Sequence, residues 1–230
     1  LITDKTRLLI INSPQNPTGS ITEPEHLREI YELAVKYDLY IYSDEIYSRM
    51  VYEANDFFSI ASLDQAKERV ILSNGFSKAF AMTGWRLGCV VAPSVIAERM
   101  MLLLQTTSSC VSAFIQRAGI AAIEGDQNPV DHMVNEYKSR RDLLVDGLNA
   151  IPGISCHKPG GAFYAFPNIS SFGISSEQFA QVMLEEANVA LLPGSNFGSQ
   201  GEGFIRMVYA SSKESINKAL DRMAVACRSI

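Results

Sequence analysis

Residues 73–88 read S-N-G-F-S-K-A-F-A-M-T-G-W-R-L-G, and this stretch lies between two short apolar runs. The runs Val70–Leu72 and Cys89–Ala92 are typical of strands. The stretch is therefore interpreted as the connection between two strands of one sheet. It contains three glycines, three hydroxyl residues, one lysine and one arginine, a composition that suits a ligand-binding loop.

The lysine of this stretch, Lys78, has the apolar neighbours Phe76, Ala79 and Phe80. Removing water from an ammonium favours the free amine, which is a nucleophile toward carbonyl groups. Arg86 follows in a glycine-flanked turn, where its planar, permanently charged guanidinium suits a phosphate. A nucleophilic lysine beside a phosphate anchor is what a pyridoxal phosphate (PLP) site needs. A lone lysine of this kind is more often an ordinary solvated residue than a catalytic one. Further motifs are therefore needed to choose between these two interpretations.

The composition describes a folded protein and excludes several functions. Of the 230 residues, 47% are hydrophobic and 20% are charged, which is typical of globular proteins. A net charge of −5 without a basic cluster argues against nucleic-acid binding. No apolar run reaches the length of a membrane span. The four cysteines form no close pairs and predict the reduced thiols of a cytoplasmic protein, and the three histidines lack metal-ligand spacing.

A loop rich in proline and glycine, residues 12–19, follows the apolar strand predicted over Arg7–Ile11. Two prolines and a glycine continue neither a strand nor a helix. Open α/β sheets bind ligands at the carboxyl ends of their strands, and Asn16 offers an amide donor there. A plain turn is the simpler interpretation of N-P-T-G taken alone.

The next predicted strand, Leu39–Tyr42, runs directly into the sequence S-D-E-I-Y, residues 43–47. An acid at the end of an apolar strand is typical of phosphate-hydrolysing ATPases, but the phosphate-binding loop of those proteins is absent. The alternative is a carboxylate, Asp44, that pairs with a protonated pyridine nitrogen. Tyr47, three residues later, could reach the same ring.

Alternating strands and helices up to Pro93 predict an α/β domain with a mostly parallel sheet. Its first helix is expected to begin with a capping box formed by Thr22 and Glu25. Further helices are predicted over residues 96–106, 111–123 and 129–150. The expected division is a large domain at residues 1–140 and a smaller α+β domain at 141–230, joined by a long helix near 130–150.

In the second domain, strands are predicted over residues 162–166, 189–192 and 204–209. Capping boxes at Ser175 and Ser211 predict two helices. Arg206 lies in the middle of the last strand, where a charge is costly unless it has a partner. That partner could be an internal acid or the carboxylate of a substrate.

Together these segments resemble the fold-type I, PLP-dependent aminotransferases of the aspartate aminotransferase class. The likeness covers essentially the whole chain, and the motifs keep the family's order and separations. The matching strings are N-P-T-G at 16–19, S-D-E-I-Y at 43–47, F-S-K-A-F-A-M-T-G-W-R-L-G at 76–88, P-G-G-A-F-Y at 159–164, and F-I-R at 204–206.

The resemblance implies roles for the residues that would surround the cofactor ring. Lys78 would bind PLP covalently and then carry the proton that moves during the reaction. Asp44 would bind the pyridinium nitrogen, and Asn16 and Tyr47 would hydrogen-bond the ring hydroxyl. Lys78, Asp44 and Tyr47 would therefore be the catalytic residues.

The resemblance also implies how the cofactor phosphate and the substrate are held. Ser77 and Arg86 would bind the phosphate, and Arg206 with Asn16 would bind the α-carboxylate of the amino acid. Many family members have serine where this chain has Gly75, so one phosphate contact is expected to be absent. The family also has a further segment before the N-P-T-G strand, so this chain is expected to be a carboxyl-terminal portion.

The implied activity is the transfer of an amino group between an L-amino acid and a 2-oxo acid, as in amino acid metabolism and biosynthesis, by a cytoplasmic homodimer. Two alternatives remain open from the residues. A PLP-dependent β-lyase or decarboxylase uses the same cofactor and the same site residues. A fragment or regulatory module would keep the motifs but be inactive alone.

Overall fold

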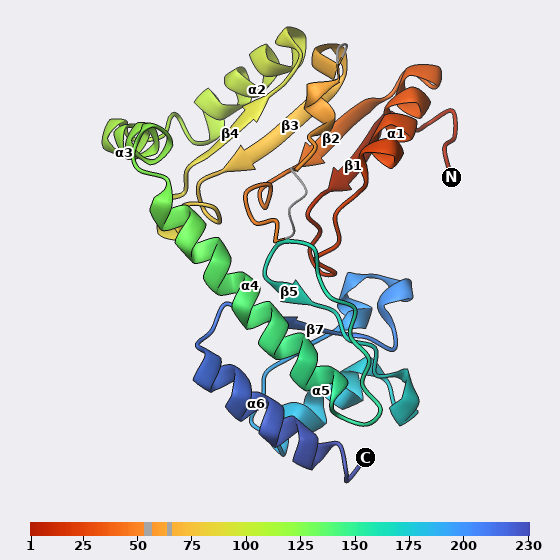
Figure 1. Ribbon diagram of the computed structural model, residues 1–230. Helices are drawn as coiled ribbons and strands as arrows, with labels where there is room; N and C mark the ends of the chain where they lie inside the picture. Colours follow the sequence, from red (N-terminus) through yellow and green to blue (C-terminus); the bar gives the residue numbers. More distant parts are fainter. Residues whose placement is uncertain (53–56, 64–65) are drawn as a thin grey trace. The chain divides into compact units, whose positions relative to one another are not determined.

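The computed structural model describes residues 1–52, 57–63 and 66–230, and Figure 1 shows their arrangement along the chain. Contacts divide these residues into two units. Unit 1 comprises residues 1–14 and 21–132, and unit 2 comprises residues 15–20 and 133–230. The division into domains 1–140 and 141–230 stays a prediction.

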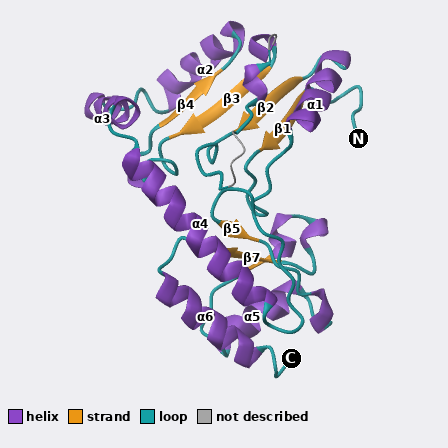
Figure 2. Cartoon of the chain, viewed as in Figure 1, coloured by secondary structure: helices purple, strands orange, loops and turns teal. Residues whose placement is uncertain are grey.

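The described part of unit 1 contains a four-stranded sheet in the order β1-β2-β3-β4 (Figure 2). Its strands are β1 (Leu8–Asn12), β2 (Tyr40–Asp44), β3 (Val70–Gly75) and β4 (Gly88–Val91). The first three strands are parallel and β4 is antiparallel to β3, which confirms the predicted mostly parallel sheet. In this register Asn12 pairs with Asp44, and Asp44 pairs with Ser73, so three strands end at one edge.

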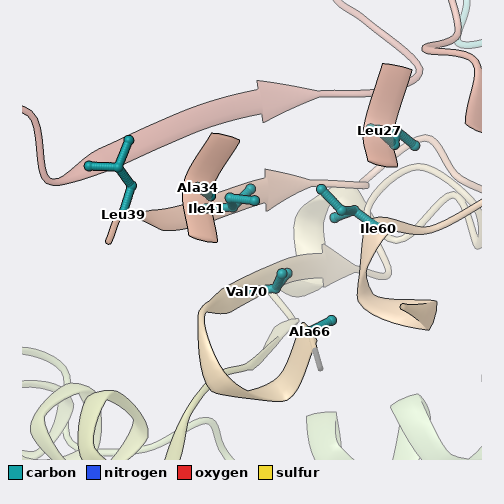
Figure 3. Close-up of a cluster of buried hydrophobic side chains, with 7 residues drawn as sticks. All are labelled: Leu27, Ala34, Leu39, Ile41, Ile60, Ala66 and Val70. Atoms are coloured by element: carbon teal, nitrogen blue, oxygen red, sulfur yellow. The ribbon is translucent and has the colours of Figure 1, made fainter. Parts of the chain in front are cut away.

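The core of unit 1 forms where helix α1 (Pro24–Lys36) packs on the sheet (Figure 3). Each large aliphatic side chain buried in this way stabilises the fold by roughly 1.5–3 kcal/mol. The buried members of this cluster are Leu27, Ala34, Leu39, Ile41, Ile60, Ala66 and Val70.

The capping box predicted at Thr22 is wrong. The helix begins after Glu23, which makes no side-chain cap, because Pro24 occupies the first turn with its fixed φ. The Thr22 backbone N–H donates instead to Ser13 Oγ at 3.0 Å. Val35, near the end of the same helix, is 47% exposed.

The remaining helices of unit 1 agree with the predicted segments. They are α2 (Ser94–Thr107), α3 (Ala113–Glu124) and the start of α4 (Asn128–Asn149), whose later turns belong to unit 2. Short 3₁₀ helices complete the described chain at Ile60–Ser62, Ala66–Glu68, Thr83–Trp85, Ser170–Phe172, Gly194–Phe197 and Ser199–Gly201.

The described part of unit 2 has an antiparallel three-stranded sheet in the order β5-β7-β6. The strands are β5 (Tyr164–Ala165), β6 (Leu192–Pro193) and β7 (Ile205–Val208), so unit 2 is α+β, as predicted. Helices α5 (Ser176–Glu185) and α6 (Lys213–Ala226) complete it.

The two predicted capping boxes of unit 2 have different outcomes. The one at Ser175 is present, with Gln178 as its partner. The last helix is capped by Ser212, which accepts from Ser215 N–H, rather than by Ser211. A run of two serines before the helix left the sequence ambiguous by one position.

Candidate cofactor and carboxylate sites

The lysine-bearing stretch forms a loop closed at its base. Gly75 and Gly88 pair at the ends of β3 and β4, and the Phe76 N–H donates to Leu87 O at 3.2 Å. A Cβ atom added to Gly75 would lie 3.1 Å from Ile46 Cδ1 and 3.2 Å from Leu87 O, so this position has little room for a side chain. We call residues 76–87 the lysine loop.

Lys78 is half-buried at the start of the lysine loop. Its neighbours Phe76 and Ala79 are buried, and the Phe76 and Phe80 rings are 5.4 Å apart. The Lys78 Nζ atom lies 6.0 Å from the centroid of the buried Tyr47 ring. The structure therefore brings together Lys78 and Tyr47, which are 31 positions apart in the sequence.

Asp44 is the last residue of β2 and is held mainly through its backbone. Its carbonyl oxygen accepts from Asn12 Nδ2 at 3.0 Å and from the Ser13 N–H at 3.2 Å. Its Oδ1 atom accepts from the Ile46 N–H at 3.2 Å. Because Asp44 pairs with Ser73 of β3, its carboxylate lies at the strand edge from which the lysine loop departs.

A second acid next to Asp44 has a different function, which sequence reasoning missed. Glu45 is 3% exposed, and its Oε1 accepts from Ser43 Oγ at 3.0 Å and from Ser59 Oγ at 2.8 Å. Burial raises the pKa of Glu45, and these hydrogen bonds oppose the rise. Glu45 therefore fixes the turn that carries Asp44 and Tyr47. The adjacent acids in S-D-E were a signal that one of the two points inward.

Arg86 ends a short 3₁₀ helix in the left-handed conformation, with φ of 52°. Its Nη1 donates to Thr83 O at 3.0 Å, and the side chain is otherwise exposed, with no carboxylate partner among the described residues. Ser77 is half-buried one position before Lys78. Guanidinium donors and a hydroxyl group suit a phosphate, and the phosphate-binding role of Arg86 and Ser77 stays a prediction.

The N-P-T-G loop belongs to unit 2 by its contacts. The Gly161 N–H donates to Gly19 O at 2.9 Å. A Cβ atom added to Gly19 would lie 2.5 Å from Pro159 Cβ, and Gly19 has φ of 68°, so the position requires glycine. Two of the quoted motifs, N-P-T-G and P-G-G-A-F-Y, therefore pack directly against each other.

This packing places Asn16 beside Arg206. Arg206 Nη1 donates to Asn16 Oδ1 at 2.9 Å. The Arg206 Cζ atom lies 4.8 Å from the Tyr164 ring centroid and 4.9 Å from that of Phe197. The Nε atom is buried and has no hydrogen-bond partner in the described part of the chain. An orphaned buried donor of this kind needs an explanation, such as an absent ligand.

An internal acid, one of the two partners expected for Arg206, is not observed. Within residues 1–52, 57–63 and 66–230, no carboxylate lies within ion-pair distance of Arg206. Asn16 and the faces of Tyr164 and Phe197 surround the guanidinium instead. Sequence reasoning missed Phe197 in this role, although the P-G-S-N-F-G loop that carries it shortly precedes the strand of Arg206.

The predicted site residues thus lie in two groups. Unit 1 contains Asp44, Tyr47, Ser77, Lys78 and Arg86, and unit 2 contains Asn16 and Arg206. Among the described residues, no group of three or more His, Cys, Asp or Glu side chains could bind a metal ion. The helices described are too short or too polar to cross a membrane.

A lysine and an acid at the carboxyl edge of a mostly parallel sheet agree with the family to which sequence comparison assigns the chain. A family model described as aminotransferase class I and II matches residues 1–223. The chain therefore belongs to the class I and II aminotransferase family, which confirms the resemblance inferred from its motifs.

Individual relatives agree with this assignment. Aspartate aminotransferase of Pyrococcus abyssi is 47% identical over 229 residues, which cover 99% of this chain and 59% of the relative. Aromatic-amino-acid aminotransferase 2 of Thermococcus litoralis is 46% identical over 224 residues, covering 96% and 57%. The crystal structure of an aromatic aminotransferase from Pyrococcus horikoshii matches with a TM-score of 0.96 at 46% identity, covering 99% of this chain and 61% of that one. The chain thus spans less than two thirds of each of these relatives.

Proposed function

We propose that this protein is a PLP-dependent aminotransferase that moves an amino group between an L-amino acid and a 2-oxo acid. The observation that carries the proposal is the grouping of Lys78, Tyr47 and Asp44 at one edge of the unit 1 sheet. The amine lies 6.0 Å from the Tyr47 ring centroid, and Asp44 ends the strand next to the one that leads to Lys78.

The chemistry of these side chains fits PLP. The Lys78 amine suits its aldehyde, and the Asp44 carboxylate suits a protonated pyridine nitrogen. The phenol of Tyr47 suits the ring hydroxyl, and Ser77 and Arg86 suit the phosphate. When bound, PLP supplies an aldehyde and a conjugated ring that delocalises electrons from the substrate α-carbon.

In this proposal each residue of the chain has a defined task. Lys78 holds the cofactor and accepts the α-proton at its Nζ atom when the substrate amine takes its place. Asp44 orients the ring and keeps its nitrogen protonated. Glu45, buried between Ser43 and Ser59, holds the turn that fixes Asp44 and Tyr47.

The substrate carboxylate is assigned in this proposal to Arg206 with Asn16. The guanidinium lacks a carboxylate partner among the described residues, and its Nε is buried without an acceptor. Planar, two-pronged recognition of a carboxylate is the task for which arginine is suited. Two relatives are named for aspartate and for aromatic amino acids, so both classes are candidate amino donors.

The proposal extends to assembly and location. A homodimer follows from the resemblance to the family and is expected for the working protein. A cytoplasmic location is supported by Cys89, Cys110, Cys156 and Cys227, all in the described part of the chain and all free. Burial raises the pKa of Cys156 and Cys227 to about 11, so neither is a reactive thiol.

The visible absorption spectrum of the chain with added PLP tests the proposal. Wild-type protein should develop the band of lysine-bound PLP, and the band should bleach with a suitable amino donor from a panel that includes aspartate and phenylalanine. The variant Lys78→Ala should lack the band. Lys218→Ala removes an exposed lysine of α6 and should behave as wild type.

The products separate the alternatives. Aminotransfer yields a 2-oxo acid that retains the donor's carbon skeleton, whereas a β-lyase cleaves a bond at the β-carbon and a decarboxylase releases carbon dioxide. A Lys78→Ala variant that bleached with amino acids at the wild-type rate would refute the assignment. Absence of the band in the wild type would favour a chain that is inactive alone.

A further inference from the structure

The loop before β7 is anchored by an acid, Glu202, which lies four positions before Arg206 in the sequence. Residues 194–203, here called the glycine loop, fold back on themselves. A Cβ atom added to Gly194 would lie 2.0 Å from Gly201 O, and one added to Gly201 would lie 2.0 Å from Gly194 O. Such a close approach of two backbone segments is possible only with glycine at both positions.

The glycine loop is tied to the start of helix α5 by Glu202. The Ser176 N–H donates to Glu202 Oε1 at 2.8 Å, and Ser176 Oγ donates to Oε2 at 2.9 Å. The Ser195 N–H donates to the same Ser176 Oγ at 3.4 Å. Ser176 is fully buried, so both ends of the loop are fixed to one buried residue.

Between these two ends the loop presents Phe197. The Arg206 Cζ atom lies 4.9 Å from the centroid of the Phe197 ring and 4.8 Å from the centroid of the Tyr164 ring. Phe197 also meets Phe166 edge to face at 6.0 Å. The orientation of the arginine therefore depends on where the loop holds Phe197.

We propose that Glu202 and Ser176 are positioning residues for Arg206, because they hold the glycine loop so that Phe197 covers the guanidinium. The inference rests on the proposed function, in which Arg206 binds the substrate carboxylate. An arginine held against two rings loses less conformational freedom when a carboxylate binds than a mobile one, and so binds it more tightly. Glu202 thereby contributes to carboxylate affinity without touching the carboxylate.

The test follows the Arg206 Nε–H by NMR in the whole 230-residue chain without PLP. Burial slows exchange of this proton, and the rings of Tyr164 and Phe197 displace its chemical shift. Glu202→Ala should move the resonance toward the position of a solvent-exposed arginine. It should also weaken binding of maleate, used as a dicarboxylate probe, by roughly three- to tenfold.

Several variants make the result specific. Phe197→Leu removes the ring itself, and so shows how far this ring displaces the chemical shift of the Arg206 Nε–H. Glu202→Gln keeps the shape and one acceptor, and should restore most of the wild-type shift. Glu177→Ala removes an exposed acid from the same first turn of α5 and should change neither readout.

Unchanged Arg206 shift and maleate affinity in Glu202→Ala would overturn the inference, since Phe166 would then be sufficient to hold Phe197. If Glu202→Ala fails to fold, Ser176→Ala tests the same link, because it removes the hydroxyl that joins Glu202 to Ser195. The readout needs neither cofactor nor turnover. A chain that forms no PLP band but shows the predicted shifts would therefore refute only the proposed function.

Discussion

Unit 2 contains two arginines with buried side-chain nitrogen atoms, and the two are held in different ways. Arg141 on α4 is 1% exposed, and its Nε and Nη2 atoms lie 2.9 and 2.8 Å from Asp142 Oδ1. Its Nη1 donates to Pro159 O at 2.8 Å. Arg206 has two aromatic rings within 5 Å of its Cζ atom, a hydrogen bond to Asn16, and a buried Nε without an acceptor among the described residues.

The difference is the one expected between a structural arginine and the ligand-binding arginine proposed at position 206. Burying a charge is costly unless a counter-charge and hydrogen bonds compensate. Asp142 and Pro159 compensate Arg141 within the chain, so that residue can do nothing more than hold α4 to the P-G-G segment. Arg206 has no counter-charge among the described residues, and in the proposed function a substrate carboxylate provides one.

The largest expected effect is on stability, at Arg141. Arg141→Met should lower the free energy of unfolding by about 3 kcal/mol, because Asp142 and the Pro159 carbonyl lose their partner. Urea unfolding followed by far-UV circular dichroism measures this, and the single tryptophan, Trp85, provides a separate signal from unit 1. The control Arg140→Met removes a partly exposed i,i+4 ion pair with Glu136 and should cost only about 0.5 kcal/mol. If Arg141→Met and Arg140→Met lowered the free energy of unfolding equally, Arg141 would not be a structural arginine of the kind described above.

The opposite result is expected at Arg206. Arg206→Met should change the free energy of unfolding by less than about 1 kcal/mol, because the guanidinium it removes has an unsatisfied donor. The same change should weaken maleate binding about 30-fold, since a charge-assisted contact to the carboxylate is lost. Calorimetric titration measures the affinity, and Arg206→Lys should recover part of it. A large loss of stability with unchanged affinity would make Arg206 a structural residue like Arg141.

A smaller effect is expected from the neighbour of Arg206. Asn16→Ala removes the acceptor 2.9 Å from Arg206 Nη1 and should weaken maleate binding about fivefold, the value of one ordinary hydrogen bond. Asn217→Ala, on the exposed side of α6, is the matched control. If Asn16→Ala binds maleate as tightly as the wild type, the arginine is oriented by its aromatic neighbours alone.

The smallest effect is a dependence of stability on pH. Burial tends to raise the pKa of Asp142, but hydrogen bonds from Lys158 and Arg141 outweigh it and hold the pKa below its ordinary value. Because this pKa is lowered on folding, the contribution of ionised Asp142 to the free energy of unfolding is fully present above about pH 4. The contribution is lost as the pH falls through the pKa of Asp142 in the folded protein. Because Asp142 is partly exposed, the loss should be about 0.5 kcal/mol.

Urea titrations between pH 7 and pH 3 should therefore show a shallower decline in Asp142→Asn than in the wild type. Asp146→Asn removes an exposed acid from the same helix and should follow the wild-type profile. Identical profiles for wild type and Asp142→Asn would mean that Lys158 and Arg141 do not stabilise the carboxylate.

What could be predicted from the sequence depends on whether a feature is set by neighbouring residues or by distant ones. The lysine loop, the strand before Asp44 and the capping box at Ser175 depend on neighbours within a few positions, so local patterns reveal them. The inward direction of Glu45 depends on Ser59, 14 residues away, and the setting of Arg206 depends on rings from other segments. No periodicity encodes such contacts, and at Thr22 even a local pattern failed because Pro24 fixed the helix start.

The origin of unit 2 in two separate segments also has a consequence for synthesis on the ribosome. Residues 15–20 emerge early, yet the side chain that Asn16 contacts lies 190 positions later. At about 5–20 residues per second, some ten to forty seconds separate the two. The lysine loop, closed between Gly75 and Gly88, can form from chain that is already available. Gly19 can pack against the Pro159–Gly161 turn once that turn has been made, but Asn16 gains its contact with Arg206 only when β7 has been made, and only then is the fold of unit 2 complete.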